Sequence, residues 1–487
     1  MNDNVFDIQK LSRRQLLKAG GLGAAAVAVA PIVAACGPAS ATAAPASAAA
    51  PTSAPATAAA SAAAGASSAP ASAAASVGAT GKITIGSFQD PAMKPFREVF
   101  IQQFQQETGI QVVYEETSYD AFYQKAKQDG MNKTGAYDIY VMDDNWVPEF
   151  AAGGVIQSLD KLGLVPNPDI IAKGLDQGYW PPRSGPRLSA FKDATPELFA
   201  LVIIDDVNLL YYNADYFSTT PATWDDIETV IKAKTASPNL YGFAVRGAKG
   251  NPAVMTYLPF LFSYGGKFVN DDWTAGVASP EAIAAFAREL SWTPYMPSAV
   301  PSFDTDQMTG LLLQGKAMAI TDYTGTAVTA IDNPASSKVV GKINLATTPK
   351  QVVNGPAIGT FICGISAGAK NPQAAVEFLQ WFTSDKIQLQ FALGGSAAVT
   401  QKALTDPTAA GKYRWLPAIA TSVANAFPKP RTPDEPKFED VLGTQINIAL
   451  GKAVDQKTGF DQIAKDALTT AAAGIDAVIQ QNKSLYF

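Results

Sequence analysis

Neighbouring carboxylates recur where predicted β-strands end. Asp143 and Asp144 follow a buried-strand pattern, Asp205 and Asp206 separate two strand-like runs, and Asp322 ends another strand. Planar carboxylates accept hydrogen bonds from neighbouring hydroxyl groups, and they can also clamp a cation. Aspartate is common in turns and helix caps too, so a purely structural role stays open for each of them.

The chain has no histidine, which limits the chemistry that it can perform. Ser-His-Asp and Cys-His catalytic systems and His-containing zinc sites are excluded, and we expect neither a metal nor a cofactor. Cys363 lies in an apolar run and is interpreted as a small core residue. Acidic residues outnumber basic ones, 43 to 37, which argues against a nucleic-acid partner.

Short β-branched runs alternate with helical patterns along much of the chain. Their order predicts mostly parallel α/β sheets, in which ligands bind beyond the carboxyl ends of the strands. That edge would carry Phe88 and Gln89 as well as Asp143 and Asp144. Thr223 and Asp226 have the spacing of a helix-capping pair. One amphipathic helix is predicted from four apolar residues at helical spacing, which are Met93, Phe96, Phe100 and Phe104.

The first 36 residues have the pattern of an export signal. Arg13 and Arg14 precede a leucine pair and a lysine, and a weakly apolar run then leads to Cys36. The run is too short for a permanent membrane span, which needs roughly twenty residues. Paired arginines resemble a twin-arginine (Tat) signal, and Val-Ala-Ala-Cys at 33–36 resembles a lipobox whose cysteine receives a lipid. An ordinary signal peptide with an incidental cysteine is the alternative.

Two further segments differ in composition from the rest of the chain. Residues 37–80 contain no charge and little apolar bulk, so we expect a disordered tether there. Residues 163–196 are rich in Pro, Gly and aromatics and are predicted to form a long surface loop. The part from 81 to 487 exceeds four hundred residues, more than one hydrophobic core normally supports, so two lobes are expected.

Several short blocks carry a family resemblance. A Tyr-Asp-Ile-Tyr strand leads into a helix that begins at a Trp and ends in a Gly-Gly turn. A Tyr-Tyr-Asn segment then precedes a helix that starts with Thr-Trp. After these come a Gly-Gly pair, a Gly-Lys-Ala-Met-Ala run and a helix that starts with Asn-Pro. In this order they resemble the family 1 extracellular solute-binding proteins of ABC importers, a group similar to maltose-binding protein. The blocks lie at 137–140, 146–154, 210–213, 223–226, 265–266, 314–319 and 371–379.

The resemblance implies an α/β, two-lobed periplasmic-binding-protein fold. Each lobe would be a mostly parallel sheet flanked by helices, and crossing hinge strands would let the lobes close over a ligand. The expected bounds are 81–204 plus 324–366 for lobe one and 207–323 plus 367–487 for lobe two, with crossings near 205–208, 322–325 and Ala367.

The resemblance also implies a ligand in the cleft between the lobes. Sugar recognition needs aromatic faces for the C–H side of the ring and planar polar groups for the hydroxyls. Gly359 and Thr360 stand in what resembles a ligand-contacting block of the family. The candidate ligand-binding residues are therefore Phe88, Gln89, Tyr119, Asp143, Asp144, Trp146, Asp205, Asp206, Trp273, Trp292, Asp322, Tyr323, Gly359, Thr360 and Trp415.

These features together predict a monomeric, lipid-anchored protein that binds a sugar or oligosaccharide outside the cytoplasmic membrane and delivers it to the transmembrane subunits of an ABC permease. No catalysis is expected. A cationic solute such as a polyamine is an alternative ligand, because carboxylates and aromatics also clamp amines. A secreted glycoside hydrolase is the alternative from another class, since it too uses paired carboxylates.

Overall fold

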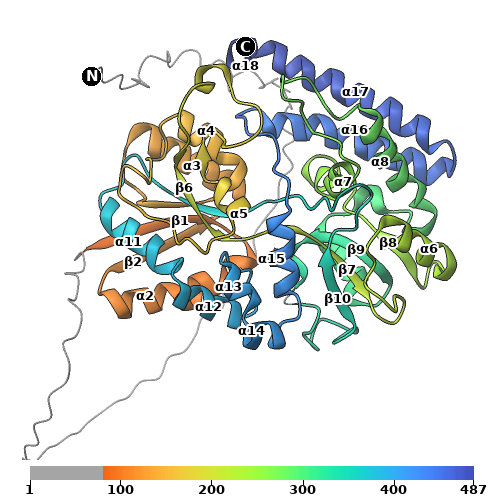
Figure 1. Cartoon of the computed structure of the whole chain (residues 1–487), viewed down its shortest axis with the longest axis horizontal. Helices are drawn as coiled ribbons and strands as arrows, with labels where there is room; N and C mark the ends of the chain where they lie inside the picture. The colour runs from red at the N-terminus through yellow and green to blue at the C-terminus, as the bar shows by residue number, and fades with distance from the viewer. Residues whose placement is uncertain (1–80, 329) are drawn as a thin grey trace, which may run out of the picture. The chain divides into compact units, whose positions relative to one another are not determined.

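The strands form two main sheets, each flanked by helices (Figure 1). The computed structural model describes residues 81–328 and 330–487. In the first sheet β11 runs against the four other strands. Its strand order is β2 (Gln111–Thr117), β1 (Lys82–Phe88), β3 (Ile139–Asp143), β11 (Phe361–Ile365) and β6 (Ala200–Ile204).

The second sheet has four strands, of which β7 runs against the other three. Both sheets are thus mostly parallel in strand direction, as the sequence predicted. The order is β10 (Ile343–Thr347), β7 (Asn208–Asn213), β9 (Ala317–Tyr323) and β8 (Tyr241–Ala244), and a separate pair joins β4 (Tyr179–Trp180) to β5 (Glu197–Leu198).

Aromatic side chains fix the helices to the first sheet. The predicted helical spacing is confirmed, because Phe96 and Phe104 are fully buried and their rings pack against Phe378 at 5.6 and 4.9 Å. Such edge-on aromatic pairs add to the stabilisation from burial. The helices on this side are α2 (Ile101–Thr108), α3 (Tyr119–Asn132), α4 (Val147–Ala152), α5 (Ala172–Asp176), α11 (Pro372–Phe382) and α12 (Asp385–Leu393).

A second aromatic core holds the other lobe together. Trp224 stacks on Phe260 with ring centroids 4.0 Å apart, and the predicted capping pair of Thr223 and Asp226 starts the helix that carries Trp224. The two longest helices pack along each other over this core (Figure 1). The helices here are α6 (Trp224–Lys234), α7 (Asn251–Ser263), α8 (Pro280–Ser291), α9 (Thr305–Leu313), α10 (Thr324–Ala327), α16 (Glu435–Gln456), α17 (Phe460–Gln481) and α18 (Lys483–Tyr486).

Three segments run side by side where the chain passes between the sheets. Val207 pairs with Ile358, and Ile358 donates its N–H to the carbonyl of Phe427 over 3.0 Å. Beside them a small helical group contacts both lobes through its last helix, which packs on β7, β10 and α5. That group consists of α13 (Gln401–Thr405), α14 (Pro407–Lys412) and α15 (Leu416–Ala424).

The lobe assignment needs correction in two places. Strand β10 lies in the second sheet although 324–366 was assigned to lobe one, and α11 and α12 lie on the first although 367–487 was assigned to lobe two. The expected crossing at Ala367 is absent, because the N–H groups of Ser366 and Ala367 bond to Asp138 and Val155 of the first lobe. The chain crosses instead between β10 and β11.

The predicted signal with Arg13, Arg14 and Cys36 and the predicted tether at 37–80 lie outside the described residues. Within the part of the chain that is described, no helix is long and apolar enough to cross a membrane.

Candidate functional site

The site is built where the end of β3 meets the start of α16. Asp143 is the last residue of β3, and Asp144 and Asn145 form the turn that follows. The Nδ2 of Asn145 donates to Oε2 of Glu435 over 3.2 Å, which joins the first lobe to the first residue of α16 in the second lobe. Asp143 and Asp144 thus stand at the end of a strand, as predicted, beside a contact between the lobes, and their role in ligand binding stays a prediction.

Aromatic rings line the first-lobe side of this boundary. Phe88 lies 5.1 Å from Tyr119, 5.9 Å from Trp146 and 5.4 Å from Phe361, measured between ring centroids. The indole of Trp146 donates to the hydroxyl of Tyr119 over 2.8 Å, and that hydroxyl donates to Oδ2 of Asp143 over 3.1 Å. Tyr119 is 38% exposed and the other rings are buried, so Tyr119 is the ring of this group that a solute can touch directly.

A buried group of charges, which we call the Lys429 cluster, completes the second-lobe side. The Nζ of Lys429 lies 3.2 Å from Oε1 of Glu439 and 3.7 Å from Oε1 of Glu435. Asn251 of α7 donates to the other oxygen of Glu439 over 3.0 Å. Arg431 donates to the carbonyl of Asp144 over 2.9 Å. Sequence analysis missed these residues, although the Pro-Lys-Pro-Arg run at 428–431 followed by carboxylates one helical turn apart was a visible signal.

Burial and neighbouring charges move the pKa values of the cluster in opposite directions. Burial, together with the nearby carboxyl of Glu439, raises the pKa of Glu435 well above its ordinary value. Burial also opposes ionisation of Glu439, but Lys429 and several hydrogen bonds outweigh it and lower the pKa of Glu439. Burial raises the pKa of Asp143 to about 7 despite the attraction of Lys429. Lys429 and the hydrogen bonds thus favour the ionised form of Glu439, whereas burial disfavours the ionised form of Glu435.

Four buried oxygen atoms at the boundary lack a hydrogen-bond partner among the described residues. One is Oε1 of Glu435, which lies 3.7 Å from the Nζ of Lys429. The other three are Oδ1 of Asp144, Oδ1 of Asn145 and Oγ1 of Thr360. The backbone N–H of Thr360 acts on the Asp144 carboxylate, so the groups of these two residues lie close together, and Asn145 is the next residue along the chain. Buried polar atoms are nearly always hydrogen-bonded, and leaving one unsatisfied costs about 1–3 kcal/mol. The arrangement can therefore recognise groups that donate hydrogen bonds.

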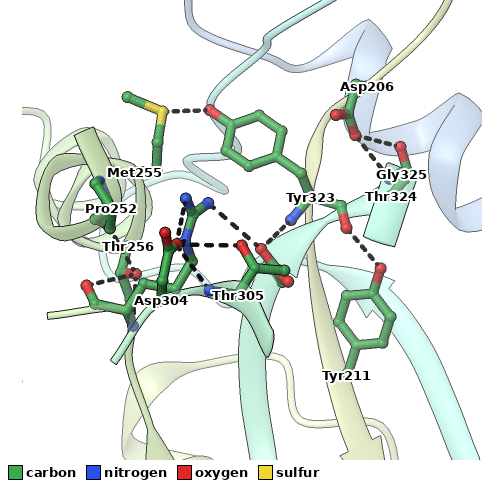
Figure 2. Close-up of polar contacts among 12 residues, drawn as sticks. Asp206, Tyr211, Pro252, Met255, Thr256, Asp304, Thr305, Tyr323, Thr324 and Gly325 are labelled. Carbon is green, nitrogen blue, oxygen red and sulfur yellow. Dashed lines mark hydrogen bonds and ion pairs between the residues drawn. The ribbon is translucent and has the colours of Figure 1, made fainter. Parts of the chain in front are cut away.

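The passage between the sheets adds Asp206, Tyr323 and Gly359. Figure 2 shows Oδ1 of Asp206 accepting from the Thr324 hydroxyl at 2.6 Å and the Gly325 N–H at 3.1 Å. Tyr323 donates its hydroxyl to Sδ of Met255 over 3.3 Å. The N–H of Gly359 donates to the carbonyl of Asp206 over 2.9 Å, and a Cβ on Gly359 would lie 3.2 Å from the Tyr323 ring. The missing side chain thus lets that ring lie against the backbone.

The contacts of Asp322 at the end of β9 are with other side chains and the backbone of the protein. Its Oδ1 accepts the N–H of Tyr323 over 2.9 Å and lies 3.9 Å from Nη1 of Arg246. Arg246 also pairs with Asp304, whose carboxylate caps α9 at the N–H of Thr305 (Figure 2). Asp322 therefore contributes to the position of Tyr323.

Five predicted site residues lie elsewhere, and we leave them out of the proposed site. The ring of Trp292 is fully buried against Phe243 and Phe260 in the second-lobe core. Asp205 is buried, with no hydrogen-bond partner for its carboxylate among the described residues, and faces Gly174. Gln89 is exposed after β1. Trp415 is buried and donates to the carbonyl of Gly395.

The fifth residue, Trp273, contacts the long loop of the first lobe. The loop at 181–196, which joins β4 to β5, extends to the second lobe, where Trp273 donates to the carbonyl of Arg187 over 3.1 Å. The Trp273 ring packs against Tyr486 of α18 at 4.9 Å. Trp273 also lines a cavity of about 630 Å³ between the loop and the carboxyl terminus. The tryptophan is therefore an interlobe contact.

The two sheets, the crossing segments and the buried polar boundary define a two-lobed binding protein. Residues 89–389 match the family model of the bacterial extracellular solute-binding proteins, and the chain belongs to that family.

The chain is similar to several known proteins. It is 24% identical over 457 residues to an erythritol/L-threitol-binding protein of Mycolicibacterium smegmatis, covering 86% of this chain and 88% of the relative. It is 23% identical over 360 residues to a probable amino-acid ABC transporter periplasmic-binding protein of Sinorhizobium fredii, covering 72% and 80%. The structure of maltose-bound MalE3 of T. maritima has a TM-score of 0.67 at 19% identity, covering 82% of this chain and all of that one.

Proposed function

We propose that this solute-binding protein captures a small neutral solute rich in hydroxyl groups, a sugar or polyol, between its two lobes. The observation that carries the proposal is the set of three unpartnered buried oxygens on Asp144, Asn145 and Thr360. Two of them can only accept a hydrogen bond, and the third belongs to a hydroxyl. A polyhydroxylated solute supplies donors and acceptors together, so its hydroxyls can satisfy all three.

The surrounding groups suit the same class of solute. Lys429 offers donors, the carboxylates of Asp143 and Asp144 offer acceptors, and the exposed ring of Tyr119 offers an apolar face. Most of these groups are buried, which strengthens each hydrogen bond to a ligand that displaces water. The relatives named for binding erythritol, L-threitol and maltose support this class without fixing the member of it.

A cationic solute is the second candidate. Four carboxylates, on Asp143, Asp144, Glu435 and Glu439, surround one lysine and one arginine, so the boundary has an excess of acidic groups. An ammonium group would also satisfy the unpartnered acceptors. Binding of a cation would weaken as salt is added, whereas binding of a neutral sugar would not.

Delivery and location form the remaining part of the proposal. The protein hands its solute to the transmembrane subunits of an ABC permease, in keeping with the ABC systems of its relatives. The Tat route exports the chain through the signal with Arg13 and Arg14. A lipid on Cys36 then holds it at the outer face of the cytoplasmic membrane, where it acts as a monomer. A Cys36→Ser variant is expected to move from the membrane fraction to the soluble exported fraction. Unchanged membrane association would contradict the anchor.

A thermal-shift panel identifies the ligand class. The chain would be heated alone and with erythritol, L-threitol, maltose and other neutral sugars, and with putrescine and spermidine. A ligand at about 100 times its dissociation constant stabilises the folded chain by roughly 2.7 kcal/mol. We expect a raised midpoint with at least one neutral polyol or sugar. Stabilisation by the amines alone would overturn the assignment.

A further inference from the structure

Lys429 occupies the centre of the interlobe boundary. Its side chain is 6% exposed, and its Nζ contacts Glu435 and Glu439 of α16. The charge also acts on Asp143 and Asp144 after β3 and on Tyr323 at the end of β9. One ammonium group is therefore surrounded by polar side chains from both lobes.

The chain fixes this ammonium in position from both ends. Pro428 and Pro430 flank Lys429, and the ring of Pro430 restricts the backbone of Lys429 because it disfavours the helical conformation at the preceding residue. At the other end Glu439 is itself held, because Asn251 of α7 donates to its second oxygen. The anchored pair keeps the Nζ in place without a ligand. Its remaining N–H groups are then available to a solute oxygen.

From this geometry we propose that Lys429 is the specificity-determining residue of the site, selecting neutral hydroxylated solutes and rejecting amines. The inference rests on the proposed function and names the residue that sets its selectivity. The Lys429 ammonium already pairs with Glu439 and lies near the other carboxyl groups that would otherwise attract a cation. A second ammonium beside it would meet like-charge repulsion in a buried setting, where screening is weak.

Lys429 acts on both the correct and the wrong solute. Lys429 donates to a ligand hydroxyl oxygen, which favours the correct solute, and it repels the wrong one. A hydrogen bond to a charged group contributes enough to change affinity by roughly 10- to 100-fold. Removal of the charge should therefore weaken polyol or sugar binding and admit amines.

The test compares two variants with a matched control. Lys429→Met keeps a side chain of similar length and removes the charge. The double variant Lys429→Met with Glu439→Gln removes both charges of the pair. It therefore leaves no unpaired Glu439 carboxylate and serves as the test if the single variant does not fold. Lys452→Met makes the same change at an exposed position of α16. Calorimetry measures the tightest of erythritol, L-threitol and maltose, and putrescine as the cationic probe.

We expect Lys429→Met to lose about 10-fold or more in affinity for the neutral ligand and to bind putrescine about 10-fold or more tightly than the wild type does. The double variant should lose the neutral ligand while staying folded, and Lys452→Met should match the wild type. Wild-type binding of a neutral ligand with both Lys429 variants unchanged would overturn this inference alone. Wild-type binding of putrescine and of none of the neutral ligands would overturn the proposed function itself.

Discussion

Asn145 and Glu435 form a direct hydrogen bond between the lobes, 3.2 Å long from Nδ2 to Oε2. They stand 290 positions apart in the sequence. The bond joins the turn after β3 to the first residue of α16, next to the charged pair of Lys429 and Glu439. This contact closes the boundary at which we place the solute.

The two glutamates of α16 should respond differently to the same substitution. Glu439→Gln removes the ionised partner of Lys429 and leaves a buried ammonium poorly paired, so it should lower the free energy of unfolding by about 3 kcal/mol. Glu435→Gln replaces a carboxyl whose charged form burial disfavours, because burial raises its pKa, so the loss should stay below about 1 kcal/mol. Urea unfolding measures both. Equal losses would show that the two carboxyls share one charge state.

Asp206 should make stability fall as the pH rises. Burial raises the pKa of Asp206 from 3.8 to about 7, partly offset by hydrogen bonds from Thr324 and Gly325. The folded chain then holds a proton that the unfolded chain has released, so this contribution is full below about pH 4 and is lost as the pH rises through 7. Asp206→Asn cannot ionise and should flatten the melting profile between pH 4.5 and 7.5. An unchanged slope would contradict this pKa.

The hydroxyl of Tyr119 should couple stability to binding. Tyr119→Phe removes the acceptor of the Trp146 indole and a donor to Asp143, which should cost about 1–2 kcal/mol of unfolding free energy. Ligand affinity should fall as well, because the Asp143 carboxyl loses its fixed position. Trp146 fluorescence and calorimetry report the two effects. A variant with lower stability but wild-type affinity would remove Asp143 from the binding site.

The loop at 181–196 should depend on Trp273 for its attachment to the second lobe. Trp273→Phe keeps a ring against Tyr486 but loses the hydrogen bond to Arg187, so trypsin should cut the loop several-fold faster. Trp381→Phe is the matched control, because that indole bonds to Glu107 on the first lobe. Equal cleavage rates in the wild type and in Trp273→Phe would show that other contacts hold the loop.

Local patterns predicted much of the fold. The buried faces of α2 and α3, the capping pair at Thr223 and the polar turn at Asp143 follow from spacing and residue type, which local sequence contains. The placement of β10 and α11 was wrong, because strand pairing and helix docking depend on contacts between distant segments.

The sequence predicted the first-lobe side of the candidate site but not the second-lobe side. Asp143, Asp144 and Thr360 stand at strand ends, where topology directs ligands. Lys429 and Glu435 lie far along the chain, and the local sequence does not show that Glu435 meets Asn145. Trp292 and Trp415 were indistinguishable by type from ligand-facing rings, because tryptophan serves equally well in a core.

The most direct test of the account is calorimetry on Thr360→Val with the tightest neutral ligand. The Thr360 hydroxyl has no partner among the described residues, so its removal should leave the unfolding free energy equal or higher while affinity falls about 10-fold. Thr400→Val is the control. The Thr400 hydroxyl is also buried and has no partner among the described residues, but Thr400 pairs with Ile170 and is not part of the proposed site. Wild-type affinity in Thr360→Val would contradict a solute bound at this boundary.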